Sequence, residues 1–450
     1  MALTHITVKG LFGELNHEIP VHWREGLTLL HGPNGTGKTS VLRILDSLFN
    51  KKFSRLQKVP ASELSVTFSD RTRLSVAWNR ENHTGKGRRK KLADLTFGLQ
   101  MPSGKTENWG YEARGERTFP LGLIEDMIPY LRRVGASAWR DVRTGQIMDL
   151  EEVMETYEDH LPVEFSHMAK TKSATPDWLL NLLNENPVYL IEAQRLVLPL
   201  TGHQRTRRGS DENNRTTTVS IYGEELAGRI KNTLADYAEN SQALDSTFPN
   251  RLLEGQREGR QVPSDEEIRS RYTAQAERRK KYVEIGLIDA GDELLLPSED
   301  LDHAARRVLD TYLDDIDDKL DRLNDLAQRL QLFLDIVNGK LRRVYLEAAR
   351  EGGLIARTRK ERQIIDLESL SSGEQQEIVI AYGLLFREIA GTLVLIDEPE
   401  LSLHVSWQLD FIPDLLRIAK VANLEFMAAT HSPQIINDRW DLAVALSDGV

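Results

Sequence analysis

The sequence contains no cysteine among its 450 residues. This excludes disulfide bonds and thiolate-bound metal sites, and it suits a reducing compartment. No apolar run approaches the roughly 20 residues that cross a bilayer, and the N-terminus lacks the pattern of a secretory signal. We therefore expect a cytoplasmic protein without a membrane partner.

Positive charge is outnumbered by negative charge. Against 69 Asp and Glu there are 58 Lys and Arg, a net charge of −11, which argues against coating nucleic acid over the whole surface. The basic residues cluster in GKGRRKK (85–91), RTRR (205–208), RRKK (278–281) and RTRK (357–360). Such clusters are usually solvated loops. The first two lie at predicted loop tips and are the candidates for contact with DNA.

The segment HGPNGTGKTS (31–40) has the spacing of a phosphate-binding loop. It follows an apolar strand and precedes an amphipathic helix, so main-chain N–H groups and a helix N-terminus are aimed at phosphates. Lys38 should reach the β- and γ-phosphates, and the Thr39 hydroxyl should ligate Mg²⁺. The predicted nucleotide-binding residues of this loop are Asn34, Gly35, Thr36, Gly37, Lys38, Thr39 and Ser40.

A second apolar strand, 391–396, ends in two carboxylates. Ligands of α/β sheets bind at the carboxyl ends of parallel strands, so this acidic pair is well placed for chemistry. We predict that Asp397 holds Mg²⁺ through water. Glu398 would accept a proton from the attacking water.

Together with SLSSGEQQE (369–377), these blocks resemble the ABC-type ATPases of the RecF, SMC and OLD (overcoming-lysogenisation-defect) group. The signature differs from the LSGGQ of transporters, and the EPELSLH that follows Asp397 is characteristic of the OLD-like branch. The ATPase subunits of the Septu and PARIS phage-defence systems look similar. The resemblance covers roughly the first 50 and the last 90 residues.

The resemblance implies further site residues and a dimer. His431 in THSP matches the switch histidine, and Gln194 matches the Q-loop glutamine that senses the γ-phosphate and the metal. Residues 401–404 stand at the D-loop position. The signature residues Ser372, Gly373 and Glu374 would contact ATP held by the opposite subunit. Since one chain carries one of each motif, we expect a homodimer or a higher homo-oligomer with ATP at the interface.

The expected fold is α/β: an ABC-type P-loop ATPase domain built from both chain ends, with a helical, short coiled-coil insertion. The predicted domains are an N-terminal lobe (1–205) with a small helical insert near 120–185, the helical insertion (206–354) and a C-terminal lobe (355–450). We expect a hairpin at 62–80 and helices near 220–246, 265–285 and 299–350. The acidic run at 314–318 is interpreted as a solvated helix face, not a nuclease site.

The function hypotheses depend on which other motifs the sequence contains beside those of the ATPase. We find no nuclease motif in this sequence, and we expect no Toprim domain of the kind that follows the switch histidine in OLD nucleases. The first hypothesis is therefore an ATPase that acts as sensor and scaffold for a separately encoded protein effector, a nuclease from the same operon, in antiphage defence. The alternative is a RecF-like clamp that binds DNA during repair. A transporter subunit is least favoured because of the EPEL sequence.

Overall fold

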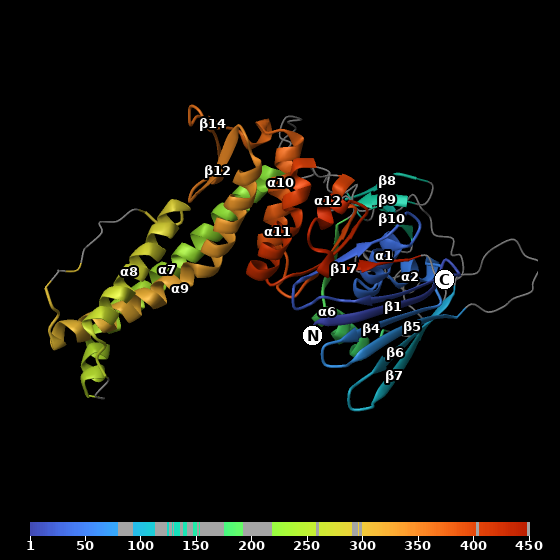
Figure 1. Ribbon diagram of the computed structural model, residues 1–450, viewed down its shortest axis with the longest axis horizontal. Coiled ribbons are helices and arrows are strands. Elements are labelled where there is room, and N and C mark those ends of the chain that lie inside the picture. Colours follow the sequence, from blue (N-terminus) through green and yellow to red (C-terminus); the bar gives the residue numbers. More distant parts are fainter. Residues whose placement is uncertain are drawn as a thin grey trace, which may run out of the picture. The chain divides into compact units, whose positions relative to one another are not determined.

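The computed structural model describes residues 1–79, 93–112, 124–125, 128, 130–135, 138–141, 147–150, 153, 175–191, 218–257, 261–289, 296, 299–401 and 405–447. Contacts divide the chain into two compact units. The first combines Met1–Arg215 with Arg387–Val450, and the second is Thr216–Phe386. The first unit is thus built from both chain ends, coloured blue and red in Figure 1.

The first unit contains a six-stranded antiparallel sheet of order β2-β1-β4-β5-β6-β7. Its strands are β1 (Leu3–Leu11), β2 (Leu15–Pro20), β4 (Glu63–Phe68), β5 (Arg73–Asn79), β6 (Asp94–Gln100) and β7 (Thr106–Tyr111). Buried and exposed residues alternate along β2 and β5, as expected when one face of a sheet packs on a core. The pairing of β4 with β5 confirms the hairpin predicted at 62–80.

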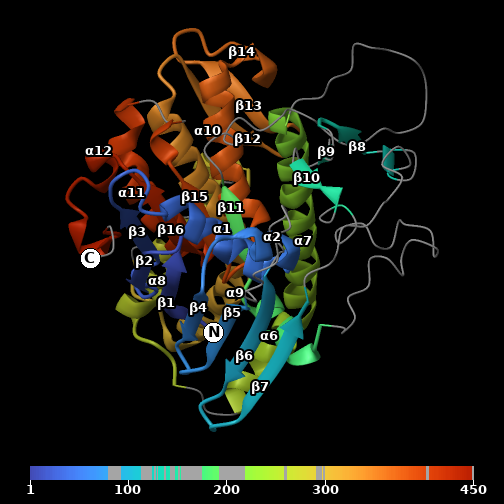
Figure 2. The ribbon, with the colours of Figure 1, turned by 90° about the vertical axis from the view of Figure 1, so that its right-hand side faces the viewer.

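A parallel sheet of order β11-β15-β16-β3-β17 forms the second layer of this unit (Figure 2). Its strands are β3 (Leu27–His31), β11 (Val188–Ile191), β15 (Leu393–Asp397), β16 (Glu425–Thr430) and β17 (Ala443–Ala445). The central strands are continuous apolar runs because both faces are buried. The register pairs Asp397 with Ala429 and Thr430 with His31, so three candidate loops leave the same sheet edge.

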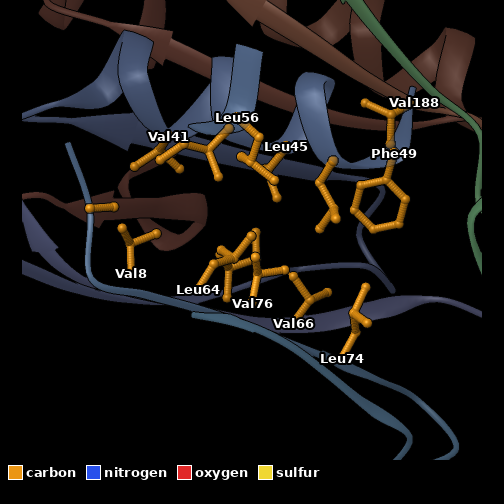
Figure 3. Close-up of a cluster of buried hydrophobic side chains, with 14 of the residues drawn as sticks. Val8, Val41, Leu45, Phe49, Leu56, Leu64, Val66, Leu74, Val76 and Val188 are labelled. Carbon is orange, nitrogen blue, oxygen red and sulfur yellow. The ribbon is translucent and has the colours of Figure 1, made fainter. Parts of the chain in front are cut away.

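Helices α1 (Lys38–Phe49) and α2 (Phe53–Lys58) contribute to one core with the antiparallel sheet. Figure 3 shows Val41 and Leu45 of α1 facing strand residues such as Val8 and Leu64. Each buried side chain of this size contributes roughly 1.5–3 kcal/mol. This packing anchors α1, and with it the loop at its N-terminus. The unit also contains α6 (Asp177–Glu185), α11 (Val405–Ala422), α12 (Pro433–Ile436) and the 3₁₀ turns Pro399–Leu401 and Trp440–Leu442.

The second unit contains three long helices and a small sheet. Helices α7 (Thr218–Arg257) and α8 (Asp265–Glu284) both pack along α9 (His303–Lys340) (Figure 1). The antiparallel sheet has the order β12-β13-β14, formed by Val344–Ala349, Gly353–Thr358 and Ile364–Ile365. A 3₁₀ turn (Leu367–Ser369), α10 (Ser372–Tyr382) and a π-helical turn (Gly383–Arg387) follow. The expected mixed α/β fold with a helical insertion is confirmed.

The acidic run at 314–318 is not simply a solvated face, and that expectation was wrong. Asp315 is buried and pairs with Arg251 of α7, while Asp314 and Asp317 accept from Arg271 of α8. Buried carboxylates need such partners because desolvation is costly. The run therefore joins α9 to both neighbouring helices.

Other local expectations also differ from the structure. Within 120–185, where a small helical insert was expected, α6 is helical, but the described residues between 131 and 149 form a sheet of β8 (Leu131–Arg133), β9 (Ala138–Asp141) and β10 (Ile147–Asp149). Strand alternation there buries Trp139 completely. Helix α9 ends at Lys340, short of 350, because the chain turns into β12.

The predicted domain boundaries stay a prediction, and the second compact unit extends to Phe386. No helix among the described residues is long and apolar enough to cross a membrane.

Candidate functional site

The glycine-rich loop joins β3 to α1 in a shape that requires glycine. Gly35 and Gly37 have φ angles of 89° and 87°, in the left-handed region. A Cβ on Gly37 would lie 2.6 Å from Leu11 Cδ2, so space also demands glycine there. The buried His17 of β2 supports the loop, with its Nε2 2.8 Å from the carbonyl oxygen of Thr36. Burial lowers the pKa of His17, so the neutral ring donates Nε2–H to this carbonyl.

Lys38 is buried and held by three acceptors. Its Nζ donates to the carbonyl oxygens of Gly32 (2.8 Å) and Pro33 (2.9 Å) and lies 3.3 Å from His431 Nδ1. Burial lowers the pKa of Lys38, while nearby carboxylates, Glu398 foremost, oppose that shift. The ammonium thus stands at the loop with its main-chain contacts exchangeable for phosphate oxygens.

Thr39 and Asp397 meet although they are 358 positions apart in the sequence. The Thr39 hydroxyl donates to Asp397 Oδ1 at 2.9 Å. Asp397 is the last residue of β15, and Thr39 lies in the first turn of α1. A hydroxyl and a carboxylate are hard oxygen ligands of the kind that Mg²⁺ prefers. These two residues therefore fit the predicted metal role.

Glu398 and His431 face each other beyond the strand ends. His431 Nε2 lies 3.5 Å from Glu398 Oε1, and Nδ1 faces Lys38. The arrangement suits a neutral imidazole that accepts at Nδ1 and donates at Nε2. Glu398 adopts a left-handed φ of 47°, a conformation that costs free energy in a non-glycine residue, and its N–H donates to Ala429 O. This strained turn directs the carboxylate towards the histidine.

Glu400 is a site residue for which the sequence analysis assigned no role. Its carboxylate accepts from the His431 main-chain N–H (2.7 Å) and from the Thr430 hydroxyl (2.9 Å). Gln408 of α11 adds a second link, because it donates to Glu400 O and accepts from the Ser432 hydroxyl. The segment after β16 is thereby tied to the segment after β15. The only sequence signal was a second carboxylate two positions beyond Glu398.

The predicted signature residues lie at the N-terminus of α10, in the second unit. Ser371 caps the helix and forms a capping box with Glu374, whose Oε2 accepts from the Ser371 N–H at 2.9 Å. Glu374 therefore serves the helix cap. Ser372 and Gly373 are exposed, and a Cβ on Gly373 would meet nothing within 4 Å. The first turn of a helix has N–H groups without helical acceptors, which suits an anion.

The remaining predicted residues are placed as follows. Asn34 is exposed beside Gly35, and Ser40 is half-buried in α1. Gln194 lies outside the described residues, as do 402–404 of the predicted D-loop. Leu401, at the start of that segment, is 69% exposed. The structure therefore brings Lys38, Thr39, Asp397, Glu398 and His431 together within the first unit.

Comparison with known proteins identifies the family of this chain. The model of the AAA ATPase domain matches residues 1–436. A local match links 81 residues, at 36% identity, to the molybdenum import ATP-binding protein ModC of Salmonella typhi and of Salmonella typhimurium (strain LT2). It covers 18% of this chain and 22% of each relative, so the chain spans about a fifth of the length of those proteins.

Two solved structures are also similar over the whole chain. One is the Smc head domain with an extended coiled coil bound to the C-terminal domain of ScpA, derived from Pyrococcus furiosus (13% identity, TM-score 0.33, 100% of this chain and 94% of that chain). The other is the SMC head domain from Thermotoga maritima (12% identity, TM-score 0.33, 100% and 97%). The assignment rests on the family model together with the P-loop ATPase fold. The chain belongs to the AAA ATPase domain family.

Proposed function

We propose that this chain hydrolyses ATP and that ATP-dependent association of two copies switches a separately encoded effector. The observation that supports hydrolysis is the convergence of Lys38, Glu398 and His431 beside the Thr39–Asp397 pair. A phosphate-binding cation, an oxygen-ligand pair and a carboxylate base are the parts that phosphoryl transfer to water requires. The first unit supplies all of them from one chain.

In the proposed reaction, Lys38 exchanges its contacts with Gly32 O and Pro33 O for phosphate oxygens. Thr39 and Asp397 would hold Mg²⁺, which when bound neutralises charge on the phosphates. Glu398 takes a proton from water as the water oxygen bonds to the γ-phosphorus and the bond to ADP breaks. His431, between Lys38 and Glu398, donates Nε2–H to a γ-phosphate oxygen. Gln194 is proposed to orient the water and the metal.

The association step rests on α10. The exposed N-terminal turn with Ser372 and Gly373 suits the γ-phosphate of ATP held by a second copy. Two such composite sites would form in a symmetric dimer, because each chain offers one loop and one signature. ATP would then act as a ligand that favours the closed dimer.

The effector assignment follows the resemblance to stand-alone OLD-like ATPases of phage defence. In this proposal the ATPase senses a trigger and controls a nuclease encoded beside it. Closure on ATP and release after hydrolysis provide the two states that such a switch needs.

The test uses Glu398→Gln, which keeps the side-chain shape but removes the base. We expect ATP turnover to fall by at least about 100-fold while ATP still drives association, measured by phosphate release and by sedimentation. The same variant, purified with ATP from its native host, should retain a nuclease after nucleic acid is digested away. Wild-type turnover by Glu398→Gln would move the base elsewhere, and an unaltered sedimentation coefficient with ATP would contradict the dimer.

A second candidate function is a RecF-like clamp that holds DNA. It is favoured by exposed arginine and lysine side chains on the β12–β14 sheet. In that case DNA, and not a nuclease, would accompany the trapped Glu398→Gln protein.

A further inference from the structure

We propose that the β12–β14 sheet of the second unit binds the phosphate backbone of duplex DNA. The inference goes beyond ATP-dependent switching, since none of the residues involved belongs to the ATP site, and it deepens the second candidate function by assigning a surface for DNA. It gives a role to the basic cluster at 357–360, which takes no part in the proposed hydrolysis of ATP.

The charge of this sheet opposes that of the chain. Residues 342–362 carry seven Lys or Arg against three Glu, whereas the whole chain is at −11. Cations gathered on one small antiparallel sheet create a local positive field within an acidic protein. Such a field attracts polyanions and is the electrostatic footprint of a nucleic-acid surface.

Some of these cations are already used within the fold. Arg350 pairs with Asp289 at 2.7 Å, and Arg357 pairs with Glu347 at 2.6 Å. Arg359 donates to the main-chain oxygens of Asn338 and Leu341, at 2.7 and 3.0 Å. These contacts hold Arg357 and Arg359 in fixed positions on the sheet.

Four other cations make no ion pair with any residue that the structure describes. They are Arg342, Arg343, Lys360 and Arg362, and all four are exposed. Arg343 directly precedes β12, and its carbonyl oxygen accepts from the Arg359 N–H at 2.9 Å, while Tyr345 of β12 pairs with Arg357 in the register. Fixed arginines thus lie beside free ones, an arrangement suited to a row of phosphates.

The surface also contains a hollow of about 340 Å³, lined by Tyr345, Glu347, Arg359 and Arg362. Two guanidinium groups there can receive one phosphate between them. Tyr345 is the single aromatic residue in β12–β14, whereas single-stranded nucleic acid is usually gripped by several stacked aromatic rings. The composition therefore favours the backbone of a duplex.

The test measures the binding of a fluorescent random-sequence duplex DNA at several salt concentrations. The surface variant is Arg343→Gln/Lys360→Gln/Arg362→Gln. The matched control, Arg279→Gln/Lys280→Gln/Lys281→Gln on α8, removes the same charge from exposed residues of the same unit. Lys38→Ala is measured as well, because it removes the lysine of the proposed ATP site. DNA binding by this variant shows whether the sheet binds DNA independently of the proposed ATPase. Thermal unfolding checks that every variant is folded.

We expect the surface variant to bind at least about tenfold more weakly at moderate salt. Its dependence of log K on log salt should be shallower by about 0.9 for each lost phosphate contact. The α8 control and Lys38→Ala should bind like wild type. Equal binding by the surface variant and the control would overturn the proposal. So would tighter binding of single strands, or binding of poly-glutamate without binding of DNA, which would assign the sheet to an acidic protein.

Discussion

At the scale of single residues, Lys38 is held within the glycine-rich loop by contacts of its own. The ammonium is satisfied by two loop carbonyls and by His431, and carboxylates nearby offset the burial that lowers its pKa. A phosphate is a stronger, charge-assisted acceptor than a carbonyl. Under the proposed function, phosphate oxygens would replace the two loop carbonyls as partners of the ammonium.

Glu400 provides a residue-scale prediction. Because its carboxylate holds the His431 N–H and the Thr430 hydroxyl, its loss should misplace the histidine while nucleotide contacts persist. We expect Glu400→Ala to lower kcat by about 10- to 100-fold with little change in KM. Glu400→Gln, which keeps one acceptor oxygen, should recover part of that loss. Steady-state phosphate release at saturating ATP measures both constants.

Glu14→Ala is the control for this prediction, since Glu14 is exposed in the same unit. It should turn over ATP like wild type. A rise in KM with unchanged kcat in Glu400→Ala would show that the carboxylate acts on binding and not on the position of His431.

At the scale of elements, helices α8 and α9 are joined by charge as much as by apolar packing. Arg271 of α8 bonds to Asp310, Asp314 and Asp317, and Arg278 bonds to Asp321. Of these carboxylates only Asp310 is buried, and because the others are partly or largely exposed each pair contributes little net stability and is screened by salt. Helices α8 and α9 should therefore keep their register, while the stability of their pairing should depend on the salt concentration.

Strand β16 carries a pH-dependent prediction. Burial raises the pKa of Glu425, at its first position, from 4.5 to about 7. The folded state prefers the protonated acid, so the contribution of this group to stability is fully present below pH 4.5 and is lost as pH rises through about 7. We expect Glu425→Gln to stabilise the protein at pH 8 by roughly 2 kcal/mol, and much less at pH 5. Urea unfolding at both pH values measures the difference.

The exposed Glu18 of β2 offers a matched substitution. Glu18→Gln should leave the wild-type pH dependence in place. If Glu425→Gln shows the same change in stability at pH 5 and pH 8, the carboxyl does not titrate in that range.

At the scale of the whole molecule, composite ATP sites predict complementation. Lys38→Ala lacks a working phosphate loop, and Ser372→Arg blocks the signature, so each alone should be inactive. In an equimolar mixture, half of the dimers pair the two variants and each of these has one intact site. We therefore expect roughly a quarter of wild-type turnover.

Mixing Lys38→Ala with the double variant Lys38→Ala/Ser372→Arg is the control, because no combination of those chains has an intact loop. Turnover of the test mixture no higher than that of its separate components would contradict an ATP site shared between subunits.

The local motifs were predictable because each is a short, continuous stretch with its own physical signature. The glycines of the loop, the apolar β15 and the capped N-terminus of α10 all follow from neighbouring residues. The mixed α/β class followed from the same elements. The strands at 131–149 were missed because they are only 3, 4 and 3 residues long, too short to show a clear alternation in the sequence.

What the sequence by itself determined is the set of local parts: a glycine-rich loop between a strand and a helix, a strand that ends in two carboxylates, and a helix with a capped N-terminus. Only the tertiary structure decided how the parts meet. Lys38 and His431 are 393 positions apart, and the clamp of Glu400 on His431 depends on two parallel strands lying side by side. The pairing of the acidic run with Arg251 and Arg271 likewise depends on which helix faces touch. Contacts between distant segments are set by packing, and local sequence does not encode packing partners.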